Sequence, residues 1–371
     1  MSGPDAEGYV GAGIDIARKG ILSDSIYSIP FYSMGYPILI AIFFLVFGES
    51  WIVFFQLFQI IISCISLWLI YKIFNSKFSE NLVAFAVLII AISPANFVLS
   101  SQAIPDNILQ ILLLISIYFL SSIFSGTKKN RNYLYGLLFG ILAGLAIAIH
   151  ARAALIIVLI TLIVLVKSQL RMLEKIYFVL GGVIFPGFIL LRNFVVLGKA
   201  TLSDSTFFAY ASGHLRTNKQ NAELGLINQM CEGISCNLKA AINAPTEYLL
   251  DTFENLLFFW SPNSGSLQRG VWFHNISVYS KLDSLGLEVL ALVIALCLAI
   301  LSFLLFILGS LIAINRRDLT LITLSLSIYV QWFLDGLLYG SNLHRMTVFV
   351  FLIPIQVLGM EFLLKKFHKI T

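Results

Sequence analysis

Acids, histidines and arginines stand beside the ends of long apolar runs in segments that lie far apart in the sequence. They are Asp5 and Glu7, Asp106, His150 and Arg152, Arg192, Asp335, and His344 with Arg345. An ionisable group inside or at the edge of a membrane is costly, so groups at such positions are candidates for function. Carboxylates suit proton transfer, and arginines suit an anion such as phosphate. The pattern predicts one site that combines acid–base groups with anion binding.

Each of these residues also has an explanation without chemistry. Asp5 fits an N-cap for a helix over residues 6–19, and His150 fits a residue that satisfies a tight turn. Arg152 fits a snorkelling side chain, while Arg192 and Arg345 fit interfacial anchors. Asp335, a turn or two inside its apolar run, is the hardest to explain this way, and pairing with an arginine would account for it.

The sequence contains no cluster with metal-ligand spacing, no P-loop and no nucleophile elbow. We therefore assign no metal ligands and no definite cofactor, although the predicted site is compatible with a divalent metal.

The composition shows which elements must position these groups. Of 371 residues, 59% are hydrophobic and only 12% are charged, against roughly 25% charged residues in soluble domains. The chain is therefore predicted to be an integral membrane protein, which excludes a disordered chain and a disulfide scaffold. The net charge of +5 indicates topology rather than nucleic-acid binding, because Lys and Arg placement sets orientation in membrane proteins.

Nine apolar runs approach the roughly 17 to 25 residues needed to cross a bilayer. They are residues 50–74, 81–98, 107–122, 133–149, 151–167, 173–191, 287–312, 319–339 and 346–364. The stretch 133–167 is too long for one crossing, so it is predicted to form a hairpin that turns at residues 150–152. The run 37–47 is too short to cross and is predicted to lie at, or dip into, one face. The expected fold is an all-α polytopic transmembrane bundle.

Five basic clusters fall at alternate helix ends and predict the cytoplasmic side. They are Lys72 and Lys77; Lys128, Lys129 and Arg131; Lys167, Arg171 and Lys175; Arg316 and Arg317; and Lys365, Lys366 and Lys369. The candidate site residues then all lie on the outer side. The chain divides into a first outer loop (1–49), transmembrane helices (50–191), a long outer loop (192–286), and C-terminal helices with a basic tail (287–371).

The long outer loop contains an amphipathic segment, residues 245–260, which predicts a helix on the outer membrane surface. Cys231 and Cys236 in the same loop fit either a local disulfide or two free thiols. The first outer loop needs a preceding helix to carry it across the membrane, so we expect one further helix upstream of Met1.

A family resemblance adds to this pattern. Asp5 and Tyr9 stand four residues apart in residues 4–20, and Met34-Gly35-Tyr36-Pro37 and an apolar run ending at Gly48 follow. This order resembles the first outer loop of GT-C membrane glycosyltransferases, and more narrowly the dolichyl-phosphate-mannose protein mannosyltransferase-like group. In that family an Asp follows the first transmembrane helix, a Tyr comes four residues later, and the Asp is taken as the catalytic base.

The resemblance continues along most of the chain. Asp106 stands where an acid is usual, Arg152 matches the arginine of a Thr-Arg-Pro-like turn, and Arg192-Asn193 matches an Arg-Asn pair that opens the long loop. His344-Arg345, with Pro354, matches an arginine-led final helix. The family's first helix is absent, Ala6 replaces a second acid found in some relatives, and His150-Ala151-Arg152-Ala153 lacks the threonine and proline. A second carboxylate would then have to be Glu7.

The resemblance implies transfer of a sugar from a polyprenyl-phosphate donor to a lipid, glycan or protein hydroxyl, with inversion at the anomeric carbon. Asp5 would act as base, and arginines such as Arg152, Arg192 or Arg345 would hold the phosphate. We expect a bacterial cytoplasmic membrane rather than an endoplasmic reticulum. A lipid-linked polysaccharide polymerase or ligase, a secondary transporter and a non-enzymatic scaffold are the alternatives. A transporter would favour internal repeats and polar groups at the bilayer midplane.

Overall fold

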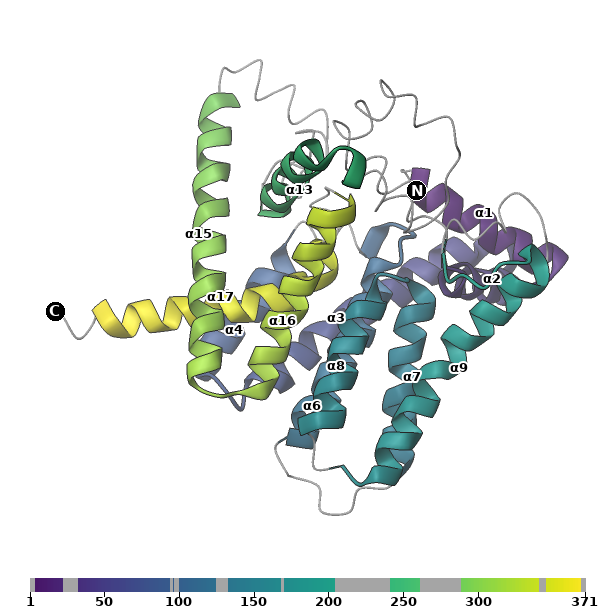
Figure 1. Ribbon diagram of the computed structural model, residues 1–371, viewed down its shortest axis with the longest axis horizontal. Helices are drawn as coiled ribbons and strands as arrows, with labels where there is room; N and C mark the ends of the chain where they lie inside the picture. The colour runs from purple at the N-terminus through teal and green to yellow at the C-terminus, as the bar shows by residue number, and fades with distance from the viewer. Residues whose placement is uncertain are drawn as a thin grey trace. The chain divides into compact units, whose positions relative to one another are not determined.

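The computed structural model describes residues 4–22, 33–93, 96, 100–124, 133–167, 170–203, 241–260, 288–339 and 345–367. Helices make up the described elements, with no strand among them (Figure 1), which confirms the all-α prediction. The chain forms two compact units. The first comprises Met1–Asp204 and Ala313–Ser327, and the second comprises Ser205–Ile312 and Ile328–Thr371.

The helices of the first unit follow the predicted apolar runs. They are α1 (Pro4–Lys19), α2 (Gly35–Phe47), α3 (Trp51–Phe74), α4 (Glu80–Ile92), α6 (Asp106–Phe124), α7 (Tyr133–Ile149), α8 (Ala153–Lys167) and α9 (Met172–Leu197). The predicted hairpin turn at residues 150–152 separates α7 from α8. The helix α4 is shorter than the predicted run 81–98, because Ser93 before Pro94 has an extended backbone that ends it.

The second unit contains the remaining described helices. They are α13 (Pro245–Trp260), most of α15 (Glu288–Asn315), the second half of α16 (Leu319–Leu334), the π-helical turn η3 (Asp335–Tyr339) and α17 (Arg345–Phe367). The helix α13 has the bounds expected for the surface helix of the long loop. Its placement on a membrane surface stays a prediction.

Five described stretches are long and apolar enough to cross a membrane: Gly35–Phe74, Met172–Leu197, Leu296–Asn315, Leu319–Leu337 and Val348–Lys366. Four shorter apolar helices, Glu80–Ile92, Asp106–Ser122, Gly136–Ile149 and Ala153–Val166, fall on the other predicted runs. The first stretch joins α2 to α3 through a short 3-10 turn (Gly48–Ser50). The count of nine crossings, the shallow position of 37–47 and the sidedness stay predictions.

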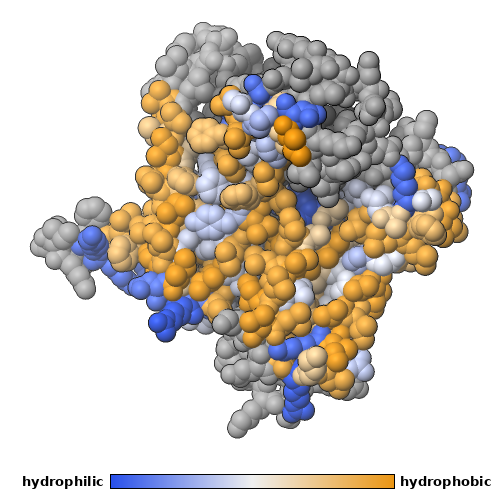
Figure 2. Space-filling model, in the orientation of Figure 1, coloured by the Kyte–Doolittle hydropathy of each residue, from blue (hydrophilic) through white to orange (hydrophobic). Residues whose placement is uncertain are grey.

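The helix surfaces are apolar on the outside as well as the inside. Leu45, Val166 and Met172 are exposed, and apolar side chains cover most of the face drawn in Figure 2. A soluble protein rarely exposes such contiguous apolar surface. This arrangement supports a multi-pass membrane protein whose outward side chains face lipid.

A seam of glycines joins α7 to α9. Gly136, Gly140 and Gly144 recur every four residues on α7, and a Cβ on Gly140 would overlap the carbonyl oxygen of Phe178 on α9. A Cβ on Gly181 of α9 would lie 2.5 Å from the carbonyl oxygen of Leu137. Small residues at this spacing let helix backbones touch, the usual packing of membrane helices without large side chains between them. The seam fixes the 150–152 turn relative to the end of α9.

The helices α1 and α2 pack against the ends of α7 and α9. One residue from each of these helices, together with Met34 just before α2, forms a buried cluster: Ile16, Met34, Ala41, Ala148 and Ile189. The backbone of α7 comes so close to α2 that a Cβ on Gly35 would overlap the carbonyl of Ala148. The helices α1 and α2 are thus held against α7, which precedes the turn with Arg152, and against α9, which carries Arg192.

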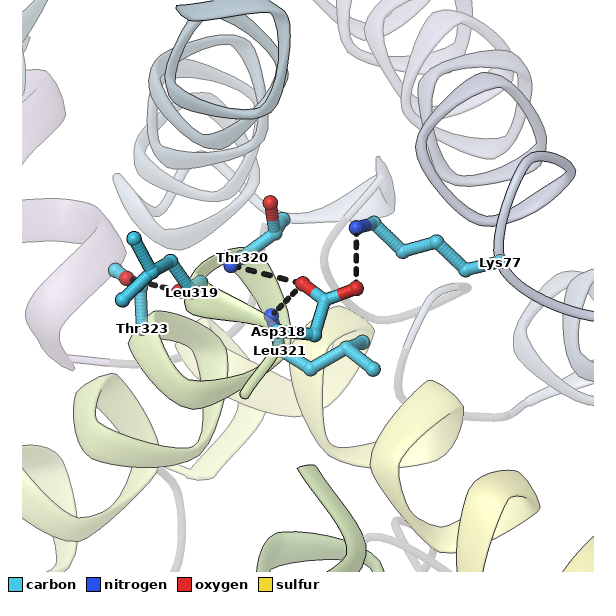
Figure 3. Close-up of polar contacts among 6 residues, drawn as sticks. All are labelled: Lys77, Asp318, Leu319, Thr320, Leu321 and Thr323. Atoms are coloured by element: carbon cyan, nitrogen blue, oxygen red, sulfur yellow. Dashed lines mark hydrogen bonds and ion pairs between the residues drawn. The ribbon is translucent and has the colours of Figure 1, made fainter. Parts of the chain in front are cut away.

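Two loops predicted to be cytoplasmic meet in the first unit. The Lys77 ammonium, after α3, lies 2.6 Å from a carboxylate oxygen of Asp318, before α16 (Figure 3). The other oxygen of Asp318 accepts hydrogen bonds from the backbone N–H groups of Thr320 at 3.0 Å and Leu321 at 3.1 Å. Asp318 is therefore the N-cap of α16 and an ion-pair partner at once. The contact agrees with the prediction that both loops lie on one side.

In the second unit, α13 presents its polar side to the protein. Asn255 donates a hydrogen bond to the carbonyl of Gly336 at 3.3 Å, and the Trp332 indole N–H donates to the carbonyl of Leu256 at 2.7 Å. The opposite side exposes the apolar residues Leu249, Leu250, Phe253 and Leu257. This inverted arrangement is typical of a helix that rests on lipid.

Candidate functional site

The structure brings Asp106 and Arg152 together as an ion pair. Asp106 begins α6, and Arg152 lies in the turn between α7 and α8, 46 residues further along. A guanidinium Nη2 of Arg152 contacts a carboxylate oxygen of Asp106. Their side chains are only 4% and 14% exposed, respectively. Two residues predicted from separate segments to share a site are therefore direct neighbours.

Local hydrogen bonds hold the turn that carries Arg152. The backbone N–H of Ala151 donates to the hydroxyl of the buried Ser33 at 2.7 Å, and the N–H of Arg152 donates to Nδ1 of His150 at 3.3 Å. His150 thus satisfies the turn, as one of the two sequence interpretations expects. Ser33 thus supports the turn from a segment that is distant in the sequence.

The Arg152 guanidinium has an unused donor. Its Nε is buried and has no hydrogen-bond partner among the described residues. An arginine carries five N–H donors in a fixed fork, and a buried donor without an acceptor is costly. The site therefore has one acceptor position to fill beside a charge already paired with a carboxylate.

Arg192 and Asn193 form a different kind of contact. The Nε of Arg192 donates to the carbonyl of Ile21 at 3.0 Å, and its Nη1 donates to the side-chain oxygen of Asn193 at 2.9 Å. The Asn193 amide donates to the carbonyl of Thr201 at 2.6 Å. Both residues are buried. The pair ties the end of α9 to the segment after α1 and to the start of the long loop.

The predicted catalytic segment is helical. The helix α1 begins at Pro4, so Asp5 lies inside its first turn rather than before it as a cap. The side chain of Asp5 lies outside the part of the chain that the structure describes. Glu7 is exposed, whereas Tyr9 is buried with its ring edge-on to Tyr36 at 5.1 Å between centroids.

Three buried polar residues close to Asp106, namely Asn107, Gln59 and Ser63, are not among the site residues predicted from the sequence. Asn107 contacts Gln59 and Ser63 of α3, and Gln59 contacts Tyr36 of α2. A signal was available, because Gln59 and Ser63 stand four residues apart in an otherwise apolar helix and so share one face.

The remaining predicted residues belong to the second unit. Asp335 is fully buried at the start of η3, and Gln331 donates a hydrogen bond to its carboxylate at 3.4 Å. Pairing of Asp335 with an arginine stays a prediction. Arg345 begins α17, but its side chain is not among those described, and His344, Cys231 and Cys236 lie outside the described residues. The convergence of Asp335, His344 and Arg345 with Arg152 stays a prediction.

Among the described residues, no group of three or more His, Cys, Asp or Glu side chains could hold a metal ion.

Comparison with known proteins gives a family match. Residues 33–191 match the family described as dolichyl-phosphate-mannose-protein mannosyltransferase. The matched segment begins just before α2 and extends into α9, so it contains both Asp106 and Arg152. No curated protein is significantly similar to the chain.

Two solved structures share a distant likeness with the chain. One is the archaeal oligosaccharyltransferase AglB from Archaeoglobus fulgidus, in complex with an inhibitory peptide and a dolichol-phosphate. It aligns with 98% of this chain at 13% identity and a TM-score of 0.47, and this chain spans 47% of its length. The other is ArnT from Cupriavidus metallidurans in the apo state, with 97% of this chain and 74% of ArnT aligned, 12% identity and a TM-score of 0.40.

At these TM-scores neither likeness carries weight for fold or activity. The family match over residues 33–191 does carry weight, and it confirms the resemblance seen in the sequence to the dolichyl-phosphate-mannose protein mannosyltransferase-like group.

Proposed function

We propose that the protein is a membrane glycosyltransferase that uses a polyprenyl-phosphate sugar. The observation that carries this proposal is the buried Arg152, paired with Asp106 and with its Nε unsatisfied among the described residues. A phosphate oxygen is an anionic acceptor that forms a strong, charge-assisted hydrogen bond with such a donor. The family match over residues 33–191 supports the same donor chemistry.

In the proposed reaction, an acceptor hydroxyl attacks the anomeric carbon of the sugar. The bond from that carbon to the phosphate oxygen breaks, and polyprenyl phosphate leaves with the bonding electrons. The hydroxyl proton passes to the carboxylate of Asp5, with Glu7 as the second acid of the segment, and the configuration at the anomeric carbon inverts. Arg152 stabilises the negative charge that grows on the leaving phosphate.

The donor would reach this site from the outer leaflet of a bacterial cytoplasmic membrane, with its tail among the helices. The acceptor is a hydroxyl on a lipid, a glycan or a protein. Arg192 and Arg345 are the other proposed phosphate contacts. The guanidinium of Arg192 already bonds the carbonyl of Ile21 and the side chain of Asn193, so we place the main phosphate contact at Arg152.

The test is transfer of radiolabelled sugar from polyprenyl-phosphate donors by the full chain in liposomes. We expect Asp5→Asn and Arg152→Gln each to lower transfer by a factor on the order of 100. Arg171→Gln, at an exposed arginine before α9, is the control and should transfer at the wild-type rate. Equal transfer by the wild type and Arg152→Gln would remove Arg152 from the mechanism, and no transfer from any donor would favour a transporter.

A further inference from the structure

The first turn of α6 is fastened to α3 by one side chain. Asn107, which follows Asp106, is fully buried. Its amide nitrogen donates to the carbonyl of Gln59 at 3.0 Å, and its amide oxygen accepts from the hydroxyl of Ser63 at 3.2 Å. Two hydrogen bonds in opposite senses fix both the position and the rotation of the amide. The backbone that carries Asp106 is thereby fixed as well.

The same contacts continue to the first outer loop. The Gln59 side chain donates to the hydroxyl of Tyr36 at 3.4 Å. The Tyr36 ring meets the Tyr9 ring edge-on at 5.1 Å. A continuous path of contacts therefore leads from Asp106 through α3 and α2 to Tyr9 on α1, the helix that also carries Asp5. We call Asn107, Ser63, Gln59 and Tyr36 the amide network.

Stability alone does not explain the amide network. All four residues are buried, and the side-chain oxygen of Gln59 has no hydrogen-bond partner among the described residues. An unsatisfied buried acceptor is costly, and apolar side chains of similar size would fill the same space without that cost. Buried polar groups do, however, fix one arrangement where apolar contacts would tolerate several.

We infer that Asn107 and Ser63 are positioning residues of the proposed transferase site. They set the place of Asp106, and through its ion pair the direction of the Arg152 guanidinium, while Gln59 and Tyr36 hold α1 on the same framework. None of the four touches the reacting atoms in this inference. It rests on the proposed function for its kinetic consequence, but its structural consequence can be measured independently.

The serines of α3 offer a matched pair of variants. Ser63→Ala removes the hydrogen bond to Asn107, whereas Ser66→Ala removes a hydroxyl, equally buried, that donates to the carbonyl of Ile62 in its own helix at 3.0 Å. We expect Ser63→Ala to lower kcat/KM for sugar transfer about tenfold per folded molecule. Ser66→Ala and the conservative Ser63→Thr should keep the wild-type value.

Hydrogen exchange of the backbone gives a readout that does not depend on transferase activity. The N–H groups of Ala151 and Arg152 are hydrogen-bonded in the wild type, so their exchange reports how firmly the turn is held. With the full chain in nanodiscs, we expect Ser63→Ala to speed exchange in peptides that cover residues 150–154 at least threefold. The two control variants should leave it unchanged.

The two measurements distinguish a failure of the positioning role from a failure of the proposed function. Faster exchange with Ser63→Ala, in a protein that transfers no sugar, would refute the proposed function and keep the positioning role. Identical exchange and identical kinetics for Ser63→Ala and Ser66→Ala would overturn the positioning role. A loss of transfer that only follows the amount of folded protein, with kcat and KM unchanged, would also overturn it.

Discussion

Arg152 follows α7 and Arg192 lies near the end of α9. Both are buried and both are predicted from the sequence to hold phosphate, yet the structure holds them in different ways. Arg152 pairs with the carboxylate of Asp106, whereas the guanidinium of Arg192 donates to the carbonyl of Ile21 and to the side chain of Asn193. Another anion can replace the carboxylate beside the guanidinium, because the positive charge of Arg152 is then still paired with a negative one. A backbone carbonyl holds a loop in place. Under the proposed function, we therefore expect anion exchange at Arg152 and loop anchoring at Arg192.

The largest effect should come from a change that disturbs both arginines at once. Gly140→Ala places a methyl group against the carbonyl of Phe178 and forces α7 from α9. We expect loss of more than about 3 kcal/mol of stability, since overpacking alone costs about 1–3 kcal/mol and here the obstacle is backbone. The yield and melting temperature of the purified chain would measure it. Gly187→Ala is the control: it also adds a methyl group, on α9, but that Cβ would meet only the side chain of Val183 in the same helix, at 3.7 Å. Equal melting temperatures for the two variants would contradict the seam.

Removing the acid from the Arg152 pair should have the next largest effect. Asp106→Asn leaves the guanidinium buried without its carboxylate, which costs about 3–5 kcal/mol when a buried pair is broken. We expect a lower melting temperature and slower transfer, with part of the stability restored by added polyprenyl phosphate, which can replace the missing anion. Thermal unfolding with and without that lipid is the measurement. Wild type and variant gaining equal stability from the lipid would count against an exchange of anions at Arg152.

Lysine substitutions should separate the two arginines kinetically. Arg152→Lys keeps the charge but loses the planar fork, so we expect the KM for the donor to rise about tenfold. Arg192→Lys keeps donors for a carbonyl but loses the fixed planar fork that bonds Ile21 and Asn193 at once, so we expect kcat to fall about threefold with little change in KM. Steady-state kinetics over a range of donor concentrations would show the split. A rise in KM of the same size for both variants would make the two arginines equivalent.

The smallest effect should come from the ion pair that touches neither arginine. Lys77→Ala removes one side of a contact that is partly exposed, with side chains 16% and 24% exposed, so we expect a loss of about 0–1 kcal/mol and wild-type transfer. Asp318→Ala should cost about 1 kcal/mol more, because it also removes the cap of α16. Melting temperatures of the two variants, measured side by side, would test the difference. A drop in transfer with Lys77→Ala would show that this pair matters for the site.

The sequence was sufficient for the positions of most helices and for naming Asp106 and Arg152 as candidates for one site. Apolar runs predicted the helices because lipid requires long apolar segments, and the turn at residues 150–152 follows from the excess length of 133–167. The pairing of Asp106 with Arg152 could not be derived in the same way. It depends on which helices pack side by side, which hydrophobicity does not specify when lipid is as apolar as the core.

The amide network could not be predicted from the sequence, for a related reason. A membrane helix can contain single polar residues such as Gln59 and Ser63 without any functional reason. Only their hydrogen bonds with Asn107 indicate that they position a neighbouring helix. The α4 helix was predicted too long because its apolar run continues past Pro94, where backbone sterics rather than hydrophobicity decide. The glycine spacing of α7 was visible in the sequence and indicates a close contact with another helix, and the structure identifies that helix as α9.

The glycine seam has a consequence for how the protein responds to its surroundings. Membrane helices usually adjust to a thinner or thicker bilayer by tilting, at modest cost. Backbones in direct contact, as at Gly140 and Gly181, leave no side-chain layer to absorb a change of angle. The separation of Arg152 from Arg192 should therefore be a constant of the fold, the same in short-chain and long-chain lipids, and activity that varied with lipid length would have to originate elsewhere in the chain.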